Sequence, residues 1–247
     1  MSEISLVRQE GGLGLAVREQ GALHDVPIQY ILGIGLNYAE HAREQGKGLP
    51  ERPMVFTKSP MSASQHRDAI VVPKVCQDRP QVDFEAELAV ILGPTPTRDV
   101  PKDQALSRVW AYANANDVSA RWWQKEGSGG QFCRGKSFDT FCPIGPRLVP
   151  AREVKDPQDL RVVCRVNGET MQEGTTRDMI FDVATLIAEL SRGTTLPPGT
   201  VIMTGTPSGV GFARKPPVFL NDGDTVEIEI GEPKVFGTLK NVVRFER

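Results

Sequence analysis

The chain has 247 residues, a formal net charge of −2 and 24% charged residues, close to the average of globular proteins. It has no basic stripe or acidic tail, which argues against nucleic-acid binding and electrostatic membrane docking. No apolar run reaches the ~20 residues of a membrane helix, and "MSEISLVRQEGG" lacks the apolar core of a secretory signal. The four cysteines form no C-x-x-C pair, so reduced thiols in a cytoplasmic protein are expected.

The N-terminal part predicts strands followed by a short helix. Residues 1–28 are expected to form a small β segment, because alternating stretches such as "LGLAVRE" are separated by glycines. A single larger domain is expected at 29–247. It begins with a buried strand at 30–38, and helix formers at 39–46 then end at a glycine.

The middle of the chain predicts strands and one loop. Residues 68–73 and 83–93 have the β-branched and apolar character of strands. The stretch 103–117 begins with helix formers and finishes in a strand-like pattern. Residues 124–137, "QKEGSGGQFCRGKS", are rich in glycine and predict a mobile loop.

The C-terminal part adds a hairpin, a helix and more strands. Residues 160–172 predict a hairpin with Asn167-Gly168 at its turn. In 179–193 the apolar residues recur at helical spacing until Gly193. Strands and helices do not alternate regularly, which disfavours a doubly wound parallel sheet. The prediction is a strand-dominated α+β fold with a sandwich or rolled sheet.

Acidic residues alternate in "DFEAELAV". On one continuous strand Asp83, Glu85 and Glu87 would share a face. Two carboxylates ~6 Å apart repel by roughly 2–3 kcal/mol at an effective dielectric constant near 20. Water relieves this repulsion on a solvated face, and a divalent cation relieves it in a cleft. Glu227 and Glu229 have the same spacing, so spacing alone favours a solvated face for either pair.

Three further residues are candidates with ordinary alternatives. Asp117 follows the apolar run "VWAYANAN", where an unpaired charge is costly, although it also fits a helix or turn cap. His41 and Glu44 stand at i, i+3 on the expected helix, so a general-base pair is weighed against a casual surface pair. Lys136 alone fits a solvated loop lysine.

The chain resembles the fumarylacetoacetate hydrolase family from about residue 30 to the C-terminus. The resemblance is carried by a series of motifs in order: "GLNYAEHARE" (35–44), "PMVFTKSP" (53–60), "VDFEAELAVILG" (82–93), "NDVSARWWQ" (116–124), "GKSFDTFCPIGP" (135–146), "VNGETMQ" (166–172) and "VIMTGTPSGVG" (201–211). Each motif is modest alone, whereas the ordered series is highly specific. It implies a mixed β-sandwich roll and a homodimer.

The resemblance also implies the site residues. Its metal ligands fall on Glu85, Glu87 and Asp117, and Mg²⁺ or Mn²⁺ is the expected ion, with Ca²⁺ as a further oxygen-preferring candidate. The segment with His41 and Glu44 corresponds to a lid whose dyad activates water. The positions that contact substrate fall on Gln124, Lys136 and Thr206, and Lys136 is expected to take part in catalysis.

Two positions depart from the family pattern. Leu36 stands where many acylpyruvase-like members have the arginine of "GRNY", so a carboxylate-binding arginine is missing or is replaced from elsewhere. Trp122 stands at the aspartate that commonly follows "SAR", which is expected to alter the pocket rim.

The implied activity is metal-dependent hydrolysis of a C–C bond in small 2,4-dioxo acids, through a metal-stabilised enolate. The same site allows an alternative, in which it acts as an oxaloacetate-type decarboxylase or as an isomerase or hydratase of 2-oxo acids. A second alternative is a non-catalytic metal-binding module. The sequence does not choose the substrate, because selectivity depends on the shape of the pocket.

Overall fold

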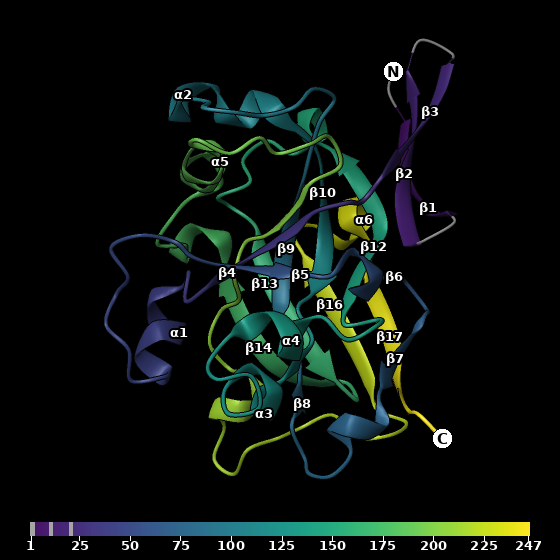
Figure 1. Ribbon diagram of the computed structural model, residues 1–247, viewed down its shortest axis with the longest axis vertical. Coiled ribbons are helices and arrows are strands. Elements are labelled where there is room, and N and C mark those ends of the chain that lie inside the picture. Colours follow the sequence, from purple (N-terminus) through teal and green to yellow (C-terminus); the bar gives the residue numbers. More distant parts are fainter. Residues whose placement is uncertain (1–2, 10–11, 20–21) are drawn as a thin grey trace.

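The computed structural model describes residues 3–9, 12–19 and 22–247 (Figure 1). Strands dominate these ranges, and short helices lie at the margins of the sheets. This confirms the predicted strand-dominated α+β class. None of the helices in these ranges combines the length and apolar character that crossing a membrane requires.

A three-stranded antiparallel sheet stands at one end of the molecule (Figure 1). It consists of β1 (Glu3–Gln9), β2 (Gly12–Glu19) and β3 (Ala22–Pro27). Leu15 and Val17 are buried in the same hydrophobic cluster as Ile91 and Val201 of the central sheet. The N-terminal strands are therefore packed onto the rest of the fold, and a separate domain at residues 1–28 stays a prediction.

The central sheet has seven strands and collects the elements that carry the site. Its order is β5 (Met54–Lys58), β4 (Ile31–Gly35), β15 (Val201–Met203), β9 (Ala86–Leu92), β10 (Val109–Asn116), β12 (Cys142–Pro150) and β6 (Ala63–Gln65). β9 is antiparallel to β10 and β15, and β15 is parallel to β4. The start of β9 therefore meets the ends of β10, β15 and β4 at one edge.

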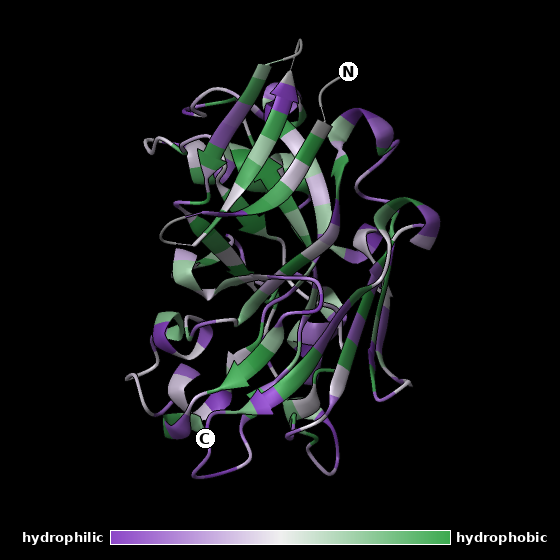
Figure 2. Cartoon of the chain, turned by 90° about the vertical axis from the view of Figure 1, so that its right-hand side faces the viewer, coloured by the Kyte–Doolittle hydropathy of each residue, from purple (hydrophilic) through white to green (hydrophobic). Residues whose placement is uncertain are grey.

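A five-stranded sheet packs against this central sheet. Its order is β14 (Glu169–Thr175), β13 (Arg161–Val166), β16 (Thr225–Ile230), β17 (Leu239–Phe245) and β7 (Ala69–Val72). Leu88 and Val90 of β9 share a hydrophobic cluster with Val162 of β13 and Ile228 of β16. Hydrophobic residues accordingly concentrate in the strands (Figure 2). The predicted hairpin is present, and Asn167 and Gly168 adopt the positive φ values of a tight turn.

β9 is buried on both faces, and this explains its nearly continuous apolar sequence. Ala86, Leu88 and Val90 face the cluster shared with the five-stranded sheet, whereas Ala89 and Ile91 face the cluster shared with the N-terminal sheet. The predicted strand over 83–93 is wrong in one respect. The chain leaves a small two-stranded sheet after β8 (Val82–Asp83), which pairs with β11 (Ser119–Ala120), and joins the central sheet only at Ala86.

The helices are α1 (Ala39–Glu44), α2 (Lys102–Ala105), α3 (Arg121–Gln124), α4 (Phe132–Lys136), α5 (Val183–Ser191) and α6 (Pro233–Phe236). The expected helix–strand succession over 103–117 is present as α2 and β10. The loop predicted over 124–137 is wrong in its second half, because α4 forms there and buries Gly135 and Lys136. The apolar contacts that stabilise such a short helix are long-range and invisible to local glycine content.

α5 depends on its N-cap. Asp182 Oδ1 accepts a hydrogen bond from Thr185 N at 2.7 Å, and its Oδ2 lies 2.7 Å from Lys102 Nζ on α2. We expect Asp182→Ala to lower the free energy of unfolding by about 1 kcal/mol, measured by urea titration. Asp182→Asn keeps the cap and should lose clearly less. Equal losses in the two variants would show that the ion pair, not the cap, stabilises this corner.

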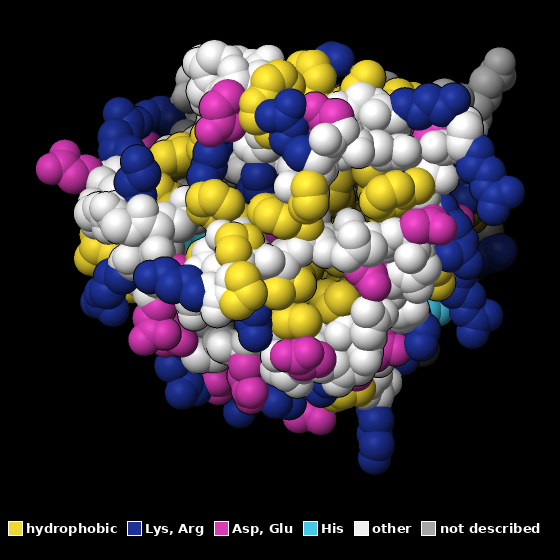
Figure 3. Space-filling model, turned by 90° about the horizontal axis from the view of Figure 1, so that it is seen from below, with side chains coloured by type: hydrophobic (Ala, Val, Ile, Leu, Met, Phe, Trp, Pro, Cys, Tyr) yellow, Lys and Arg dark blue, Asp and Glu magenta, His cyan; other side chains and the backbone are white. Residues whose placement is uncertain are grey.

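The face seen from below carries charges of both signs around a central group of hydrophobic side chains (Figure 3). Lysine and arginine side chains are interspersed with aspartate and glutamate on this face. This distribution gives no single-sign field there of the kind that attracts a polyanion.

Candidate active site

Three carboxylates meet at the shared edge of the central sheet. Glu87 lies in β9, Glu85 comes just before that strand, and Asp117 follows β10 directly. They are 1%, 6% and 0% exposed, and their oxygens lie within 4.8 Å of one another. Backbone pairing holds them together, because Asp117 N donates to Glu85 O at 2.9 Å and Ala115 pairs with Glu87.

Three buried cations surround these carboxylates. Lys136 Nζ lies 2.7 Å from Glu85 Oε2 and 2.6 Å from Asp117 Oδ2. Lys58 Nζ lies 2.7 Å from Asp117 Oδ1 and donates to the Lys136 carbonyl, and Arg121 lies 2.7 Å from Glu85 Oε1. The alternative of a solvated loop lysine is thus wrong for Lys136. Neither Lys58 nor Arg121 was expected to belong to the site, although both stand in motifs of the quoted series.

Asp83 lies outside the set of converging carboxylates, although it shares Arg121 with Glu85. Arg121 donates to its Oδ2 from Nε at 2.8 Å and from Nη2 at 2.6 Å, and the backbone N–H groups of Gly211 and Phe212 also donate to it. The expectation that Asp83 shares a face with Glu85 and Glu87 is therefore wrong. The chain changes sheets between these positions, so the strand alternation does not continue through them.

The cluster shifts the pKa values of its two glutamates in opposite directions. Burial opposes ionisation of Glu85, but Lys136 and Arg121 outweigh it and lower its pKa to about 2. Burial, together with the charges of Asp117 and Glu85, raises the pKa of Glu87 well above 4.5. For Lys136, burial acts to lower the pKa, but Asp117 and Glu85 raise it overall, so this side chain stays an ammonium.

The donor set fits a divalent cation. If all four buried carboxylates, including Asp83, were ionised, they would exceed the three buried cations by one negative charge, and the raised pKa of Glu87 relieves this excess in the metal-free protein. Among the described residues Glu87 has no cationic ion-pair partner, and its Oε2 accepts only from Gly205 N at 2.7 Å. Carboxylate oxygens are the ligands that Mg²⁺ and Mn²⁺ prefer. A divalent ion held by Glu85, Glu87 and Asp117 would favour the ionised form of Glu87 and supply the cationic partner that this carboxylate lacks.

The other glutamate pair behaves differently. Glu227 lies 2.8 Å from Lys240 on the neighbouring strand, and Glu229 lies 2.9 Å from Arg165. Both glutamates are half-buried, and each has its own cationic partner. Cross-strand ion pairs therefore account for this pair without a metal.

The pair formed by His41 and Glu44 lies at the side of the same site. His41 is buried in α1, and its Nδ1 lies 3.2 Å from Glu44 Oε2. Its Nε2 lies 2.8 Å from Gln45 Nε2, so an Nδ1–H tautomer donates to Glu44 and accepts from Gln45. Glu44 Oε1 also accepts from Gly209 N at 3.0 Å, which fastens α1 to the loop after β15. A casual surface pair does not describe this arrangement, because His41 is buried and Glu44 is also bonded to the Gly209 backbone.

A pocket of about 660 Å³ joins these groups. Glu85, Lys136 and His41 line it, as do the two residues expected to bind substrate, Gln124 and Thr206. Gln124 Oε1 accepts from Arg121, and its Nε2 forms no hydrogen bond within the described part of the chain. Thr206 Oγ1 donates to Ala86 O at 2.9 Å and accepts from Gln172 at 2.7 Å, so its hydroxyl proton is already used.

Leu36 and Trp122, the two departures from the family pattern, differ in their positions relative to the pocket. Leu36 lines the pocket and has a φ of +55°, which is uncommon for a residue other than glycine. Trp122 is not among the lining residues and stacks beneath the guanidinium of Arg79, 4.8 Å from its ring centroid. Only the Leu36 substitution therefore changes the chemistry of the pocket wall.

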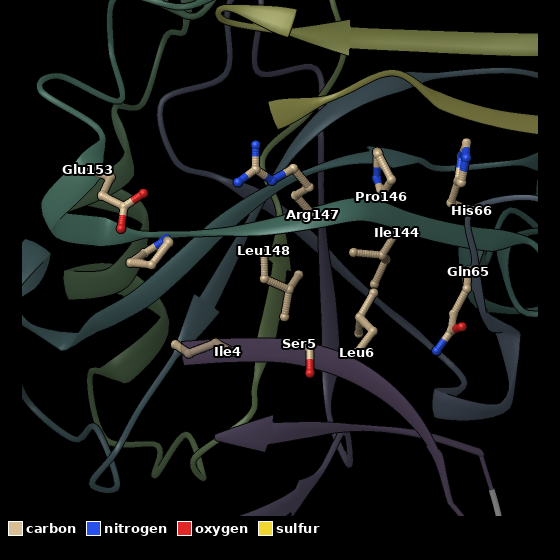
Figure 4. A pocket seen from close by; sticks show the side chains of 11 residues that line it. Ile4, Ser5, Leu6, Gln65, His66, Ile144, Pro146, Arg147, Leu148 and Glu153 are labelled. Carbon is tan, nitrogen blue, oxygen red and sulfur yellow. The ribbon is translucent and has the colours of Figure 1, made fainter. Parts of the chain in front are cut away.

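A second pocket, of about 690 Å³, lies between β1 and β12 (Figure 4). Its polar side chains Glu153, Arg147 and His66 are spread along its length and do not converge. Arg147 donates to Lys234 O, and His66 Nδ1 accepts from Lys240 N. None of the predicted site residues lines this pocket, so the pocket beside the carboxylates is the candidate site.

The position of Lys136 depends on a close approach of α3 and α4. A Cβ atom on Gly135 would overlap the backbone nitrogen of Gln124 and would lie 2.7 Å from Ala120 O. We expect Gly135→Ala to push α4 from α3, displace Lys136 and lower turnover by about tenfold or more. Gly48→Ala, where a Cβ would meet no atom within 4 Å and which lies outside the pocket lining, is the matched control. Equal losses in both variants would contradict this steric explanation.

Comparison with known sequences identifies the family of the chain. A family model described as fumarylacetoacetate hydrolase C-terminal matches residues 30–244. The human mitochondrial oxaloacetate tautomerase FAHD2A is 45% identical over 202 residues, which are 82% of this chain and 63% of the human protein. The oxaloacetate tautomerase YisK of Bacillus subtilis is 46% identical over 219 residues, 88% of this chain and 70% of YisK.

Solved structures show the same likeness over the whole chain. Fumarylacetoacetate hydrolase from Exiguobacterium antarcticum is 35% identical, with full coverage of both chains and a TM-score of 0.81. The 2-hydroxyhepta-2,4-diene-1,7-dioate isomerase of Mycobacterium marinum is 31% identical, with a TM-score of 0.78 and coverage of 100% of this chain and 99% of the isomerase. From this agreement of sequence motifs, fold and family model, the chain belongs to the fumarylacetoacetate hydrolase family.

Proposed function

We propose that this chain is a divalent-metal-dependent enzyme that interconverts the keto and enol forms of oxaloacetate or a closely similar 2-oxo acid. The observation that carries the proposal is the buried cluster of Glu85, Glu87 and Asp117 beside a pocket that also holds His41. The names of FAHD2A and YisK support this choice of reaction. The proposal therefore follows the isomerase alternative of the sequence analysis and not the predicted C–C bond hydrolase.

Glu85, Glu87 and Asp117 would hold Mg²⁺ or Mn²⁺, with Ca²⁺ as a weaker candidate. When bound, the cation supplies Lewis-acid stabilisation for negative charge on the 2-oxo oxygen of the substrate. Lys136 keeps its proton because its pKa is raised by Asp117 and Glu85 against the effect of burial. It therefore serves as a positive charge that positions two of the carboxylates and cannot serve as the base.

His41 is the proposed proton carrier. Tautomerisation moves one proton from C3 of the keto acid and adds one at the C2 oxygen, with no other bond broken. With Nδ1–H donated to Glu44, His41 Nε2 has the lone pair that takes the C3 proton, and Glu44 stabilises the imidazolium that forms. The Gln45 amide donates a hydrogen bond to that lone pair at 2.8 Å, so it must move away when substrate binds.

The remaining lining groups would orient the substrate. The Gln124 Nε2 group can donate to a carboxylate of the substrate, because only its Oε1 is bonded to Arg121. Thr206 would accept a hydrogen bond or provide a methyl contact, since its hydroxyl proton goes to Ala86 O. The motif positions of Gln124 and Thr206 and their place in the lining of the pocket support these roles.

An assay of three reactions on oxaloacetate and acetylpyruvate tests this assignment. Chelator-treated protein is supplied with Mg²⁺ or Mn²⁺, and the loss of enol oxaloacetate is followed by ultraviolet absorbance. Pyruvate release from oxaloacetate and from acetylpyruvate is measured in parallel. The proposal predicts the highest kcat/KM for tautomerisation. Faster hydrolysis of acetylpyruvate would restore the hydrolase prediction, and no turnover of any substrate would support the non-catalytic metal-binding module.

The assembly and location proposals are also open to test. Light scattering during size-exclusion chromatography would distinguish the predicted homodimer from a monomer. Fluorescence imaging of the tagged chain would test the predicted cytoplasmic location.

A further inference from the structure

Two cations of the pocket lack carboxylate partners. Lys125 and Lys47 both line the pocket, Lys125 half-buried and Lys47 exposed. Within residues 3–9, 12–19 and 22–247, neither ammonium forms an ion pair. Lys125 Nζ lies over the ring of Phe212, 3.3 Å from its centroid, a cation–π contact that fixes the amine at the pocket wall.

The other cations of the pocket are already engaged. Lys136 binds Glu85 and Asp117, and Arg121 binds Asp83 and Glu85 at distances of 2.6–2.8 Å. Both are buried, so moving either toward a ligand would leave a buried carboxylate uncompensated. An anionic group of a substrate that extends beyond the carboxylate cluster therefore meets Lys125 and Lys47.

We propose that Lys125, assisted by Lys47, forms a subsite for the distal carboxylate of a dicarboxylic 2-oxo acid. This inference rests on the proposed function and specifies its substrate class. Leu36, which stands where many acylpyruvase-like members have an arginine, also lines the pocket but contributes no charge to its wall. Lys125 follows Gln124 in the chain, so one segment presents an amide and an ammonium to the same pocket.

The position of Lys125 suits reversible anion binding. Its burial and the neighbouring positive charge of Arg121 lower its pKa, since both disfavour the ammonium in the empty pocket. A carboxylate bound beside it would remove this penalty. Lys125 is thus a specificity-determining residue, distinct from the groups that hold the metal and move the proton.

A pair of substrates that differ only at the distal group isolates this contact. Oxaloacetate carries a carboxylate where 2-oxobutanoate carries a methyl group, and both exchange their C3 protons through an enol. The protein is supplied with Mg²⁺ and kept free of Mn²⁺. NMR in D₂O then gives kcat/KM for proton exchange of each substrate. The ratio of the two values measures the preference for the dicarboxylate.

Lys125→Met should lower this ratio by about 10- to 100-fold, the range expected for a lost charge-assisted contact. Lys125→Arg should restore most of the ratio. Lys215→Met removes an exposed lysine outside the pocket and should leave the ratio unchanged. Equal losses for both substrates in Lys125→Met, or an equal fall of the ratio in Lys215→Met, would overturn the subsite.

A binding measurement separates this inference from the proposed function. If the unaltered protein exchanges neither substrate, the proposed function fails, but calorimetry still compares the Kd values of oxaloacetate and 2-oxobutanoate. A tighter Kd for oxaloacetate that depends on Lys125 upholds the subsite. Equal Kd values in the unaltered protein would reject it. Lys125→Gln provides a second variant should the methionine variant not fold.

Discussion

Replacing Glu87 by glutamine should abolish tight Mn²⁺ binding and lower oxaloacetate tautomerisation by at least about 100-fold. The estimate is a lower bound, because loss of a group that merely supports a metal ligand already costs 10- to 100-fold in affinity or activity. Calorimetric titration of Mn²⁺ and the enol assay measure the two effects. Retention of both in the variant would remove Glu87 from the metal site.

The same substitution should stabilise the metal-free protein. Burial and the charges of Asp117 and Glu85 raise the pKa of Glu87 well above 4.5. A raised pKa of an acid means that its proton stabilises the fold fully below pH 4.5 and that this contribution disappears as pH rises through the raised pKa. The metal-free unaltered protein should therefore lose stability as pH rises above 4.5, and Glu87→Gln should not.

Ionisation of Glu85 changes the stability of the fold in the opposite direction and in another pH range. Its pKa is lowered to about 2, so its contribution is present above 4.5 and disappears as pH falls toward 2. The two effects can thus be separated in one series of thermal unfolding curves. Glu227→Gln is the matched control, since Glu227 has the same spacing and pairs with Lys240. That variant should leave Mn²⁺ binding and tautomerisation unchanged.

Replacing His41 by glutamine should lower tautomerisation by about 10²- to 10⁴-fold, the range for loss of a general base. Hydrolysis of a 2,4-dioxo acid, where it occurs, should fall similarly because it needs an activated water. Decarboxylation of oxaloacetate needs neither step and should fall less. The assay compares the three rates in the variant and in the unaltered protein, and Mn²⁺ binding should stay within about twofold.

Exposed His24 provides the control for this experiment. His24→Gln should keep all three rates, because His24 lies on β3 in the N-terminal sheet, away from the pocket-lining residues. A uniform fall of tautomerisation and decarboxylation in His41→Gln would contradict the division of labour proposed for this residue.

Local patterns were sufficient for much of the fold. The periodicity of 179–193 predicted α5, and Asn167-Gly168 predicted the turn between β13 and β14, because both depend on neighbouring residues. The strand break at Phe84 was missed because the sequence alternates without interruption through it. Only the pairing of β8 with β11 and of β9 with β10 determines where each strand ends.

The acidic residues of the site and Lys136 were predictable from the motifs, whereas the buried cations Lys58 and Arg121 were not. Motif resemblance placed Glu85, Glu87 and Asp117 in one set, and the structure brings them within 4.8 Å. Lys58 is 59 residues from Asp117 in the chain, so no local pattern links the two. A lysine ordinarily belongs to the surface, and its burial becomes intelligible only once its carboxylate partner is in place.

Titration of Mn²⁺ into chelator-treated protein, with bound ion and tautomerase rate measured on the same samples, tests the central claim most directly. The account predicts one ion per chain and a rate that rises in proportion to the ion bound, both absent in Glu85→Ala. A full rate in the ion-free protein, or unchanged Mn²⁺ binding in that variant, would contradict it.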